Sequence, residues 1–188
     1  MLLTAFITSI IVAKLLGGRL SRLGQIQYRH LDFLIMSVTI QIFLHAATMV
    51  GWHLSGKSIL AAISASYALL CISLLYNLRL PGIPFALAGV IANAIVILAN
   101  GGKMPISRPM LERAGLLRYL EMLSTGGSPT HQLIEKTTKL AFLSDIFAVP
   151  PPFWRPFVFS VGDVAIVIGL FILVIKTTVV RHGVARHG

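Results

Sequence analysis

Hydrophobic side chains are concentrated in five long segments of this chain, which are separated by short polar turns and one long connection. The segments cover residues 1–16, 31–51, 58–76, 82–99 and 157–175. A bilayer's hydrocarbon core, about 30 Å thick, requires roughly 17 to 25 helical residues, and only the first and fourth segments are near the lower limit. The pattern predicts an all-α fold, a polytopic membrane helix bundle with about five transmembrane helices.

The long connection, residues 100–156, is predicted to contain amphipathic helices. Ser107 followed by Pro109 favours a helix start, and apolar residues then recur at helical spacing over residues 110–120. A second start at residues 128–130 leads into a similar pattern through residue 141. Such helices lie in the head-group plane or cover the end of a bundle. We therefore expect the connection over one mouth of a single integral-membrane domain, residues 1–188.

The composition supports a membrane environment. The chain is 56% hydrophobic and 12% charged, whereas an average soluble domain is about a quarter charged. Its net charge of +10 is explained by Lys and Arg at the ends of spans, which bind anionic head groups. We therefore expect membrane lipids as partners and no nucleic acid. The single cysteine, Cys71, lies within the third segment, so no disulfide framework is expected.

The distribution of positive charge predicts an orientation. Outside the long connection, one side of the predicted bundle carries Lys14, Arg19, Arg22, Arg29, Arg79, Lys176, Arg181 and Arg186. The other side carries Lys57, and the long connection adds seven further Lys and Arg residues there (Lys103, Arg108, Arg113, Arg118, Lys136, Lys139, Arg155). Because long loops count weakly in the positive-inside rule, we expect the N-terminus outside and the C-terminus in the cytoplasm. The first segment is expected to be an uncleaved anchor, since its positive charges follow the apolar run.

Polar residues inside the spans mark a candidate site. Gln41 and His45 are four residues apart and share one helix face. With the orientation above, Asn93 and Asp163 reach a similar depth in other spans, and Asn100 lies at the outer edge. Interhelical hydrogen bonding is one explanation for Gln41 and His45, and a ligand, proton or head-group site is the other.

Asp163 is the most informative of these residues, because a carboxylate within a span is costly and commonly marks a function. A structural ion pair with Lys103 or Arg155, or solvation at the interface, is the alternative. A metal site is not expected. Zinc requires three or four ligands at suitable spacing, whereas the histidines are scattered along the chain. No cofactor is expected either.

Three blocks of sequence resemble a known family. They are Asn-Gly-Gly-Lys-Met-Pro at 100–105, Thr-Lys-Leu-Ala-Phe-Leu-Ser-Asp-Ile at 138–146 and Phe-Ser-Val-Gly-Asp-Val at 159–164. Over most of its length the chain resembles a bacterial membrane-protein family known as domain of unknown function 5317. The resemblance implies a multi-pass protein of the bacterial cytoplasmic membrane and implies no reaction. The blocks fall at the expected outer site, whose candidate ligand-binding residues are Gln41, His45, Asn93, Asn100, Lys103, Asp145 and Asp163.

Three functional classes remain open. The favoured class is a binding or accessory subunit, in a larger membrane complex or a homo-oligomer, which recognises a lipid, a quinone or a partner protein at the outer face. A small transporter or proton-linked permeation protein requires a polar path through both leaflets, and the inner half of the spans offers few polar residues. A lipid-modifying enzyme could use His45 as a base and Asp145 or Asp163 to orient it. Because no motif names a reaction, we do not expect an enzyme and assign no catalytic residue.

Overall fold

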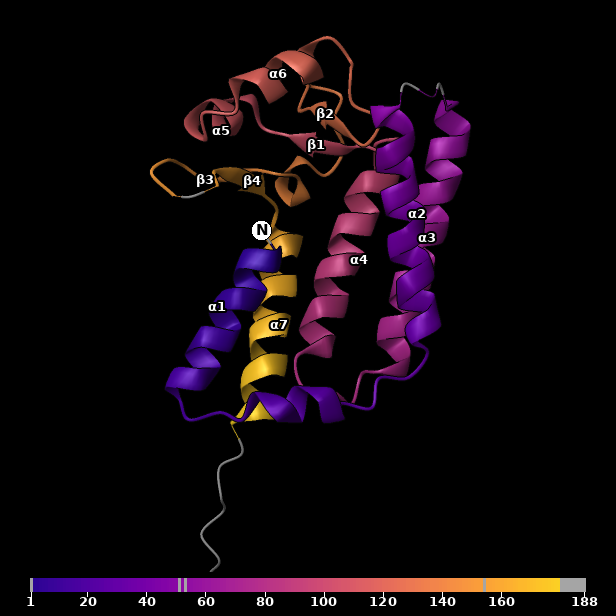
Figure 1. Cartoon of the computed structure of the whole chain (residues 1–188). Coiled ribbons are helices and arrows are strands. Elements are labelled where there is room, and N and C mark those ends of the chain that lie inside the picture. The colour runs from indigo at the N-terminus through magenta and orange to yellow at the C-terminus, as the bar shows by residue number, and fades with distance from the viewer. Residues whose placement is uncertain (1, 51, 53, 154, 180–188) are drawn as a thin grey trace, which may run out of the picture.

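The computed structural model describes residues 2–50, 52, 54–153 and 155–179, and it is mostly helical (Figure 1). The five apolar segments form its long helices, so their predicted helical structure is confirmed. By length and composition, α3 and α7 are long and apolar enough to cross a membrane. Arg181 and Arg186, which entered the charge comparison, lie outside the described residues. The long helices are α1 (Leu2–Leu15), α2 (Leu31–Met49), α3 (Gly56–Tyr76), α4 (Ile83–Ala99) and α7 (Val161–Thr178).

The long helices do not pack in chain order. Helix α7 packs against both α1 and α4, α4 packs on α3, and α3 packs on α2. The spatial order is therefore α1, α7, α4, α3, α2, with α7 between α1 and α4 (Figure 1). The two ends of this row are α1 and α2. A short 3-10 helix, η1 (Leu20–Gln25), packs near the C-terminal end of α7.

Helices α4 and α7 approach each other closely through glycines. A Cβ atom added at Gly169 would lie 2.5 Å from the carbonyl oxygen of Gly82, and one added at Gly162 would lie 2.7 Å from that of Gly89. Real side chains do not tolerate such distances, so only glycine allows the two backbones to meet here. The glycines of the last apolar segment thus form a helix contact within the chain.

A mixed helical and extended segment covers one end of the long helices. We refer to residues 100–159 as the cover. Two pairs of short strands organise it, the parallel pair β1–β2 and the antiparallel pair β3–β4. In Figure 1 the cover lies at the top, on the same side as the start of α1. Its elements are β1 (Met104–Ile106), α5 (Arg108–Arg113), α6 (Leu117–Ser124), β2 (His131–Leu133), η2 (Ala141–Leu143), β3 (Phe147–Val149) and β4 (Phe157–Phe159).

The cover differs from the expected amphipathic helices in two respects. The helix expected over residues 110–120 is interrupted between α5 and α6, because Gly115 adopts a φ of +69°. The helix expected from residues 128–130 to 141 is wrong. Residues His131–Leu133 instead pair with β1, and Leu140 has a φ of +54°, outside the helical range. Pairing with β1 satisfies the backbone groups that a helix would have satisfied internally.

The start of the last helix also differs from the expected segment. Residues Phe157–Phe159 form β4, and α7 begins at Val161 instead of residue 157. A short apolar run fits a strand or a helix equally well. The boundary is set by Ser160, whose hydroxyl accepts a hydrogen bond from the backbone N–H of Asp163. The Asp163 carboxylate in turn accepts one from the backbone N–H of Ser160, which completes a capping box.

Candidate ligand-binding cavity

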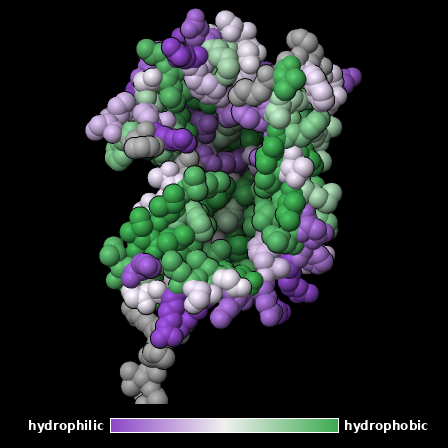
Figure 2. Space-filling model, in the orientation of Figure 1, coloured by the Kyte–Doolittle hydropathy of each residue, from purple (hydrophilic) through white to green (hydrophobic). Residues whose placement is uncertain are grey.

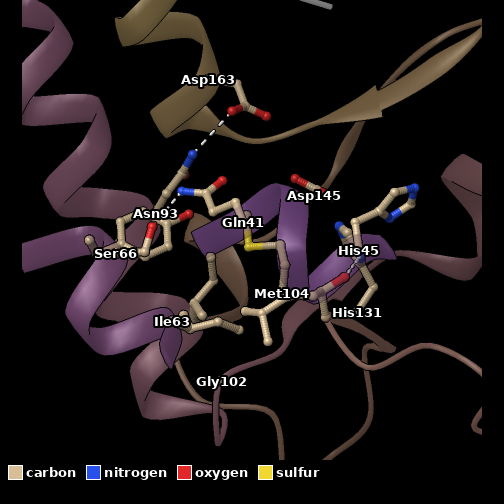
Figure 3. A pocket seen from close by; sticks show the side chains of 14 residues that line it. Gln41, His45, Ile63, Ser66, Asn93, Gly102, Met104, His131, Asp145 and Asp163 are labelled. Carbon is tan, nitrogen blue, oxygen red and sulfur yellow. Dashed lines mark hydrogen bonds between the residues drawn. The ribbon is translucent and has the colours of Figure 1, made fainter. Parts of the chain in front are cut away.

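A cavity of about 310 Å³ lies where the cover meets the long helices (Figure 3). Side chains from α2, α3, α4, α7 and the cover line it together. Five of the seven predicted site residues are among them, namely Gln41, His45, Asn93, Asp145 and Asp163. The predicted residues of similar depth in the spans therefore line one cavity. Its volume falls at the lower end of the range for small-molecule sites.

The cavity lies in a recess between apolar helix surfaces. Figure 2 shows hydrophilic residues at the inner end of this recess, beneath the cover, with hydrophobic residues on the helices to either side. Toward the cover, Ile63 of α3 and Ile97 of α4 form a buried apolar cluster with Met104 of β1, and all three residues contribute to the cavity lining. The recess therefore combines a polar end with apolar walls.

A hydrogen-bond network connects α4 to the start of α7. The Asn93 amide nitrogen donates to Asp163 Oδ1 at 3.0 Å, and the Asn93 amide oxygen accepts from the Ser160 hydroxyl at 2.8 Å. Both Asn93 and Ser160 are buried. Because the capping box already joins Ser160 to Asp163, the three side chains form a closed network. It fixes the Asp163 carboxylate at the edge of the cavity.

A second network connects α2 to α3. The Gln41 amide nitrogen donates to the Ser66 hydroxyl at 2.8 Å, and Ser66 in turn lies 3.0 Å from the Ser37 hydroxyl. Ser66 and Ser37 are fully buried. Since the amide nitrogen of Gln41 is engaged with Ser66, its amide oxygen is the group that remains to face the cavity (Figure 3).

Asp145 is the cover's contribution to the cavity. The backbone of Asp145 extends the β1–β2 pair on its other side, donating from its N–H to Pro105 O and accepting from Ser107 N–H. Its side chain is only 7% exposed, and Oδ1 has no hydrogen-bond partner. Burial, with a smaller contribution from the negative charge of Asp163, raises the pKa of Asp145 to about 8. Asp145 is therefore mostly protonated at neutral pH when no cation lies beside it.

His131 was missed as a site residue by sequence reasoning. It lines the cavity because β2 pairs in parallel with β1, which places His131 opposite Met104. Its Nδ1 lies 2.9 Å from the Thr130 hydroxyl. Burial lowers the pKa of His131 to about 4, so the ring is neutral at pH 7. Only knowledge of the strand pairing, which joins residues distant in sequence, would have identified this histidine.

Two predicted site residues lie elsewhere. The Asn100 amide nitrogen donates to the carbonyl oxygens of Val96 and Lys139, and its oxygen accepts from the Lys139 N–H. This side chain therefore fastens the cover to the end of α4. Lys103 is not among the residues that line the cavity. Within the described chain, Asp163 forms no ion pair with Lys103 or Arg155 and is held by the Asn93 and Ser160 network instead.

The cavity is acidic in a strongly basic protein. The chain has 16 Lys and Arg residues against six Asp and Glu residues. Two of those six carboxylates, Asp145 and Asp163, line the cavity, whereas its described lining contains no Lys or Arg. The described residues include no group of three His, Cys, Asp or Glu side chains suited to a metal ion. The arrangement offers hydrogen-bond acceptors and negative charge.

Comparison with known proteins identifies the family. Residues 25–175 match the model of a family described as "Family of unknown function (DUF5317)", so the chain belongs to this family. An uncharacterised protein of Thermotoga maritima is 30% identical over 131 residues, which cover 70% of this chain and 71% of that protein. No solved structure is significantly similar to the chain. The resemblance noted from the three sequence blocks is thereby confirmed.

Proposed function

We propose that this chain is a single-domain integral membrane protein with five transmembrane helices, whose cavity binds the polar head of an amphiphile. The observation that carries the proposal is the recess, which has a polar end beneath the cover and apolar walls below it. A molecule with a polar head and a hydrocarbon tail matches both parts. Such a site makes the chain a lipid-binding or accessory protein of the membrane.

The exposed surface of the helices supports the membrane location. In the most apolar stretches of α3 and α7, only 22% of the residues are buried within the molecule. A core helix of a water-soluble protein would bury most of them. With 21 and 18 residues and a rise of about 1.5 Å per residue, these helices match a hydrocarbon core about 30 Å thick. Large apolar side chains are exposed on α1, α2 and α4 as well.

The orientation follows from the charge pattern. The turn that contains Arg79, the η1 region and the end of α7 lie at the end of the bundle opposite the cover (Figure 1). The positive-inside rule then places that end in the cytoplasm of a bacterium and the cover outside. The cavity would therefore receive its ligand from the outer leaflet of the cytoplasmic membrane.

Saturable photolabelling tests the proposal. The probe is hexadecanol with a photoactivatable diazirine beside its hydroxyl group, added to the full-length protein in detergent micelles. We expect labelling that saturates, is displaced by unlabelled hexadecanol and maps by peptide mass spectrometry to the cavity lining. His45→Trp, which places a bulky ring in the lining, should remove most of this labelling. The matched control is Met36→Trp, at an exposed position on the opposite side of α2.

Labelling that rises in proportion to the probe, without saturation, and that is the same in His45→Trp and Met36→Trp would reflect partition into the micelle. The proposal of an amphiphile site would then be wrong.

A further inference from the structure

The cavity contains hydrogen-bond acceptors that the protein leaves unused. Asp145 Oδ1 has no partner although the side chain is 93% buried, the complement of its 7% exposure. Asp163 lines the same cavity, and the amide oxygen of Gln41 faces it (Figure 3). A buried acceptor without a donor is unfavourable, so this arrangement suits a ligand that supplies N–H or O–H groups.

We propose that the head of the bound amphiphile is a protonated primary amine, held between the carboxylates of Asp145 and Asp163. This inference rests on the proposed function, since it names the chemistry of the head that enters the same cavity. The ammonium group donates to Asp145 Oδ1, and the charge of Asp163 adds to the attraction. The Gln41 oxygen lies within the same lining as a third acceptor.

The charges around the cavity exclude an anionic head. The described lining contains neither Lys nor Arg, and the lowered pKa of His131 leaves its ring uncharged at neutral pH. The other titratable groups that face Asp145 are His45 of α2, Tyr67 of α3 and Asp163 of α7. A phosphate or carboxylate head would therefore approach the negative charge of Asp163 without any Lys or Arg to balance it.

The unpartnered oxygen distinguishes a primary amine from a quaternary one. A trimethylammonium head carries positive charge but no N–H group, so it would leave Asp145 Oδ1 unsatisfied. A primary ammonium has three N–H donors, enough for both carboxylates and the Gln41 oxygen. An alcohol supplies one O–H donor but no charge.

Binding of the amine is coupled to release of a proton. Before the amine binds, Asp145 is mostly protonated at neutral pH, since its pKa is raised to about 8. An ammonium ion requires the carboxylate, so the Asp145 proton passes to the solvent when the amine binds. Release of one proton makes the affinity rise about tenfold per pH unit below that pKa.

Isothermal titration calorimetry of the full-length protein in detergent micelles tests the inference. Hexadecylamine, hexadecyltrimethylammonium, hexadecanol and the soluble butylamine are the probes. We expect hexadecylamine to bind at least about tenfold more tightly than hexadecanol. Asp145→Asn should abolish this preference while hexadecanol still binds. Glu121→Gln, an exposed carboxylate on α6, is the matched control and should preserve the preference.

The pH dependence of the wild-type protein gives a readout that needs no variant. Titration at pH 7 in buffers with different ionisation enthalpies measures the protons released. We expect close to one proton per hexadecylamine bound and none per hexadecanol. Uptake or absence of protons on amine binding would overturn the inference even if Asp145→Asn fails to fold.

The remaining outcomes separate the two proposals. If hexadecanol or hexadecyltrimethylammonium binds as tightly as hexadecylamine, the amine inference is wrong and the amphiphile site stands. If butylamine binds as tightly as hexadecylamine, the hydrocarbon tail contributes nothing and the amphiphile proposal is wrong, and only the recognition of a primary amine by the two carboxylates stands. If none of the four probes binds, both are wrong.

Discussion

The amide nitrogen of Asn93 donates a hydrogen bond of 3.0 Å to Asp163 Oδ1, although the two residues are 70 positions apart in the chain. Asn93 lies in the C-terminal half of α4 and Asp163 in the first turn of α7. The bond therefore fixes the position of α7 relative to α4 at the edge of the cavity. It also shows how the Asp163 charge is held without a basic partner.

Replacing Asp163 with asparagine should weaken this contact. The two carboxylate oxygens accept from Asn93 and from the backbone N–H of Ser160, and asparagine has only one acceptor oxygen. We expect Asp163→Asn to lose one of these bonds, about 1 to 3 kcal/mol of stability. Thermal unfolding in detergent measures the change, and Asp163→Ala should lose more. An Asp163→Asn protein as stable as the wild type would contradict the network.

The glycine contact between α4 and α7 makes a second prediction. A Cβ at Gly162 would overlap the backbone of Gly89 and the side chain of Asn93. We expect Gly162→Ala to destabilise the protein by at least about 1 to 3 kcal/mol, the usual cost of overpacking. Gly56→Ala is the control, because nothing lies within 4 Å of a Cβ added there. Equal melting temperatures for the two variants would show that the helices separate readily.

The pKa of Asp145 predicts a fall in stability as pH rises. Burial raises this pKa from 3.8 to about 8, so between these values the folded protein binds a proton that the unfolded chain has lost. Stability therefore decreases with pH across this range, by at most about 1.4 kcal/mol per pH unit. His131 acts in the opposite sense, since its pKa falls from 6.5 to about 4. Its contribution grows between those values and is constant above pH 6.5.

The interval from pH 6.5 to 8 isolates the effect of Asp145. Melting temperatures measured across it should fall in the wild type and in the control Glu121→Gln. In Asp145→Asn this fall should be absent, because the group that titrates has been removed. A fall of the same size in Asp145→Asn would assign the pH dependence to another group.

Cysteine labelling tests the orientation. In a Cys71→Ala background, a cysteine at exposed Ser124 of the cover should react with an impermeant maleimide on intact bacterial cells. A cysteine at Gly24, in η1 at the opposite end, should react only after lysis. Gly24 suits this control because it is exposed and has open space around it. The reverse pattern would place the cover in the cytoplasm.

The long helices could be predicted because apolar runs of this length are typical of membrane-spanning helices. Hydrophobicity alone did not predict where each helix ends. Phe157–Phe159 is as apolar as the helix that follows, yet it forms β4. The better signal was Ser160 followed three residues later by Asp163, the spacing of a capping box. The five-span arrangement in a membrane stays a prediction, since two of the helices are long enough by themselves to cross one.

Two signals predicted lining residues of the candidate site: depth in the helices, and the sequence blocks, which added Asp145. Helical periodicity brought Gln41, His45, Asn93 and Asp163 to one level, and the structure places them around one cavity. Depth also selected Asn100, whose side chain is bonded to the backbone of Lys139 instead. The contribution of His131 depends on strand pairing within the cover, which hydrophobic periodicity does not reveal.

The position of α7 between α1 and α4 constrains the order in which the molecule is assembled. During synthesis, α1 emerges long before α7, the helix against which it packs, because α2, α3, α4 and the cover are made between them. Helices α2, α3 and α4 can associate as soon as they are complete, since each finds its neighbour next to it in the chain. Helix α1 therefore remains without its packing partner until α7 has been synthesised. In chains truncated before residue 161, α1 would lack its contact with α7. The contacts of α7 with α1 and α4 therefore form after those among α2, α3 and α4.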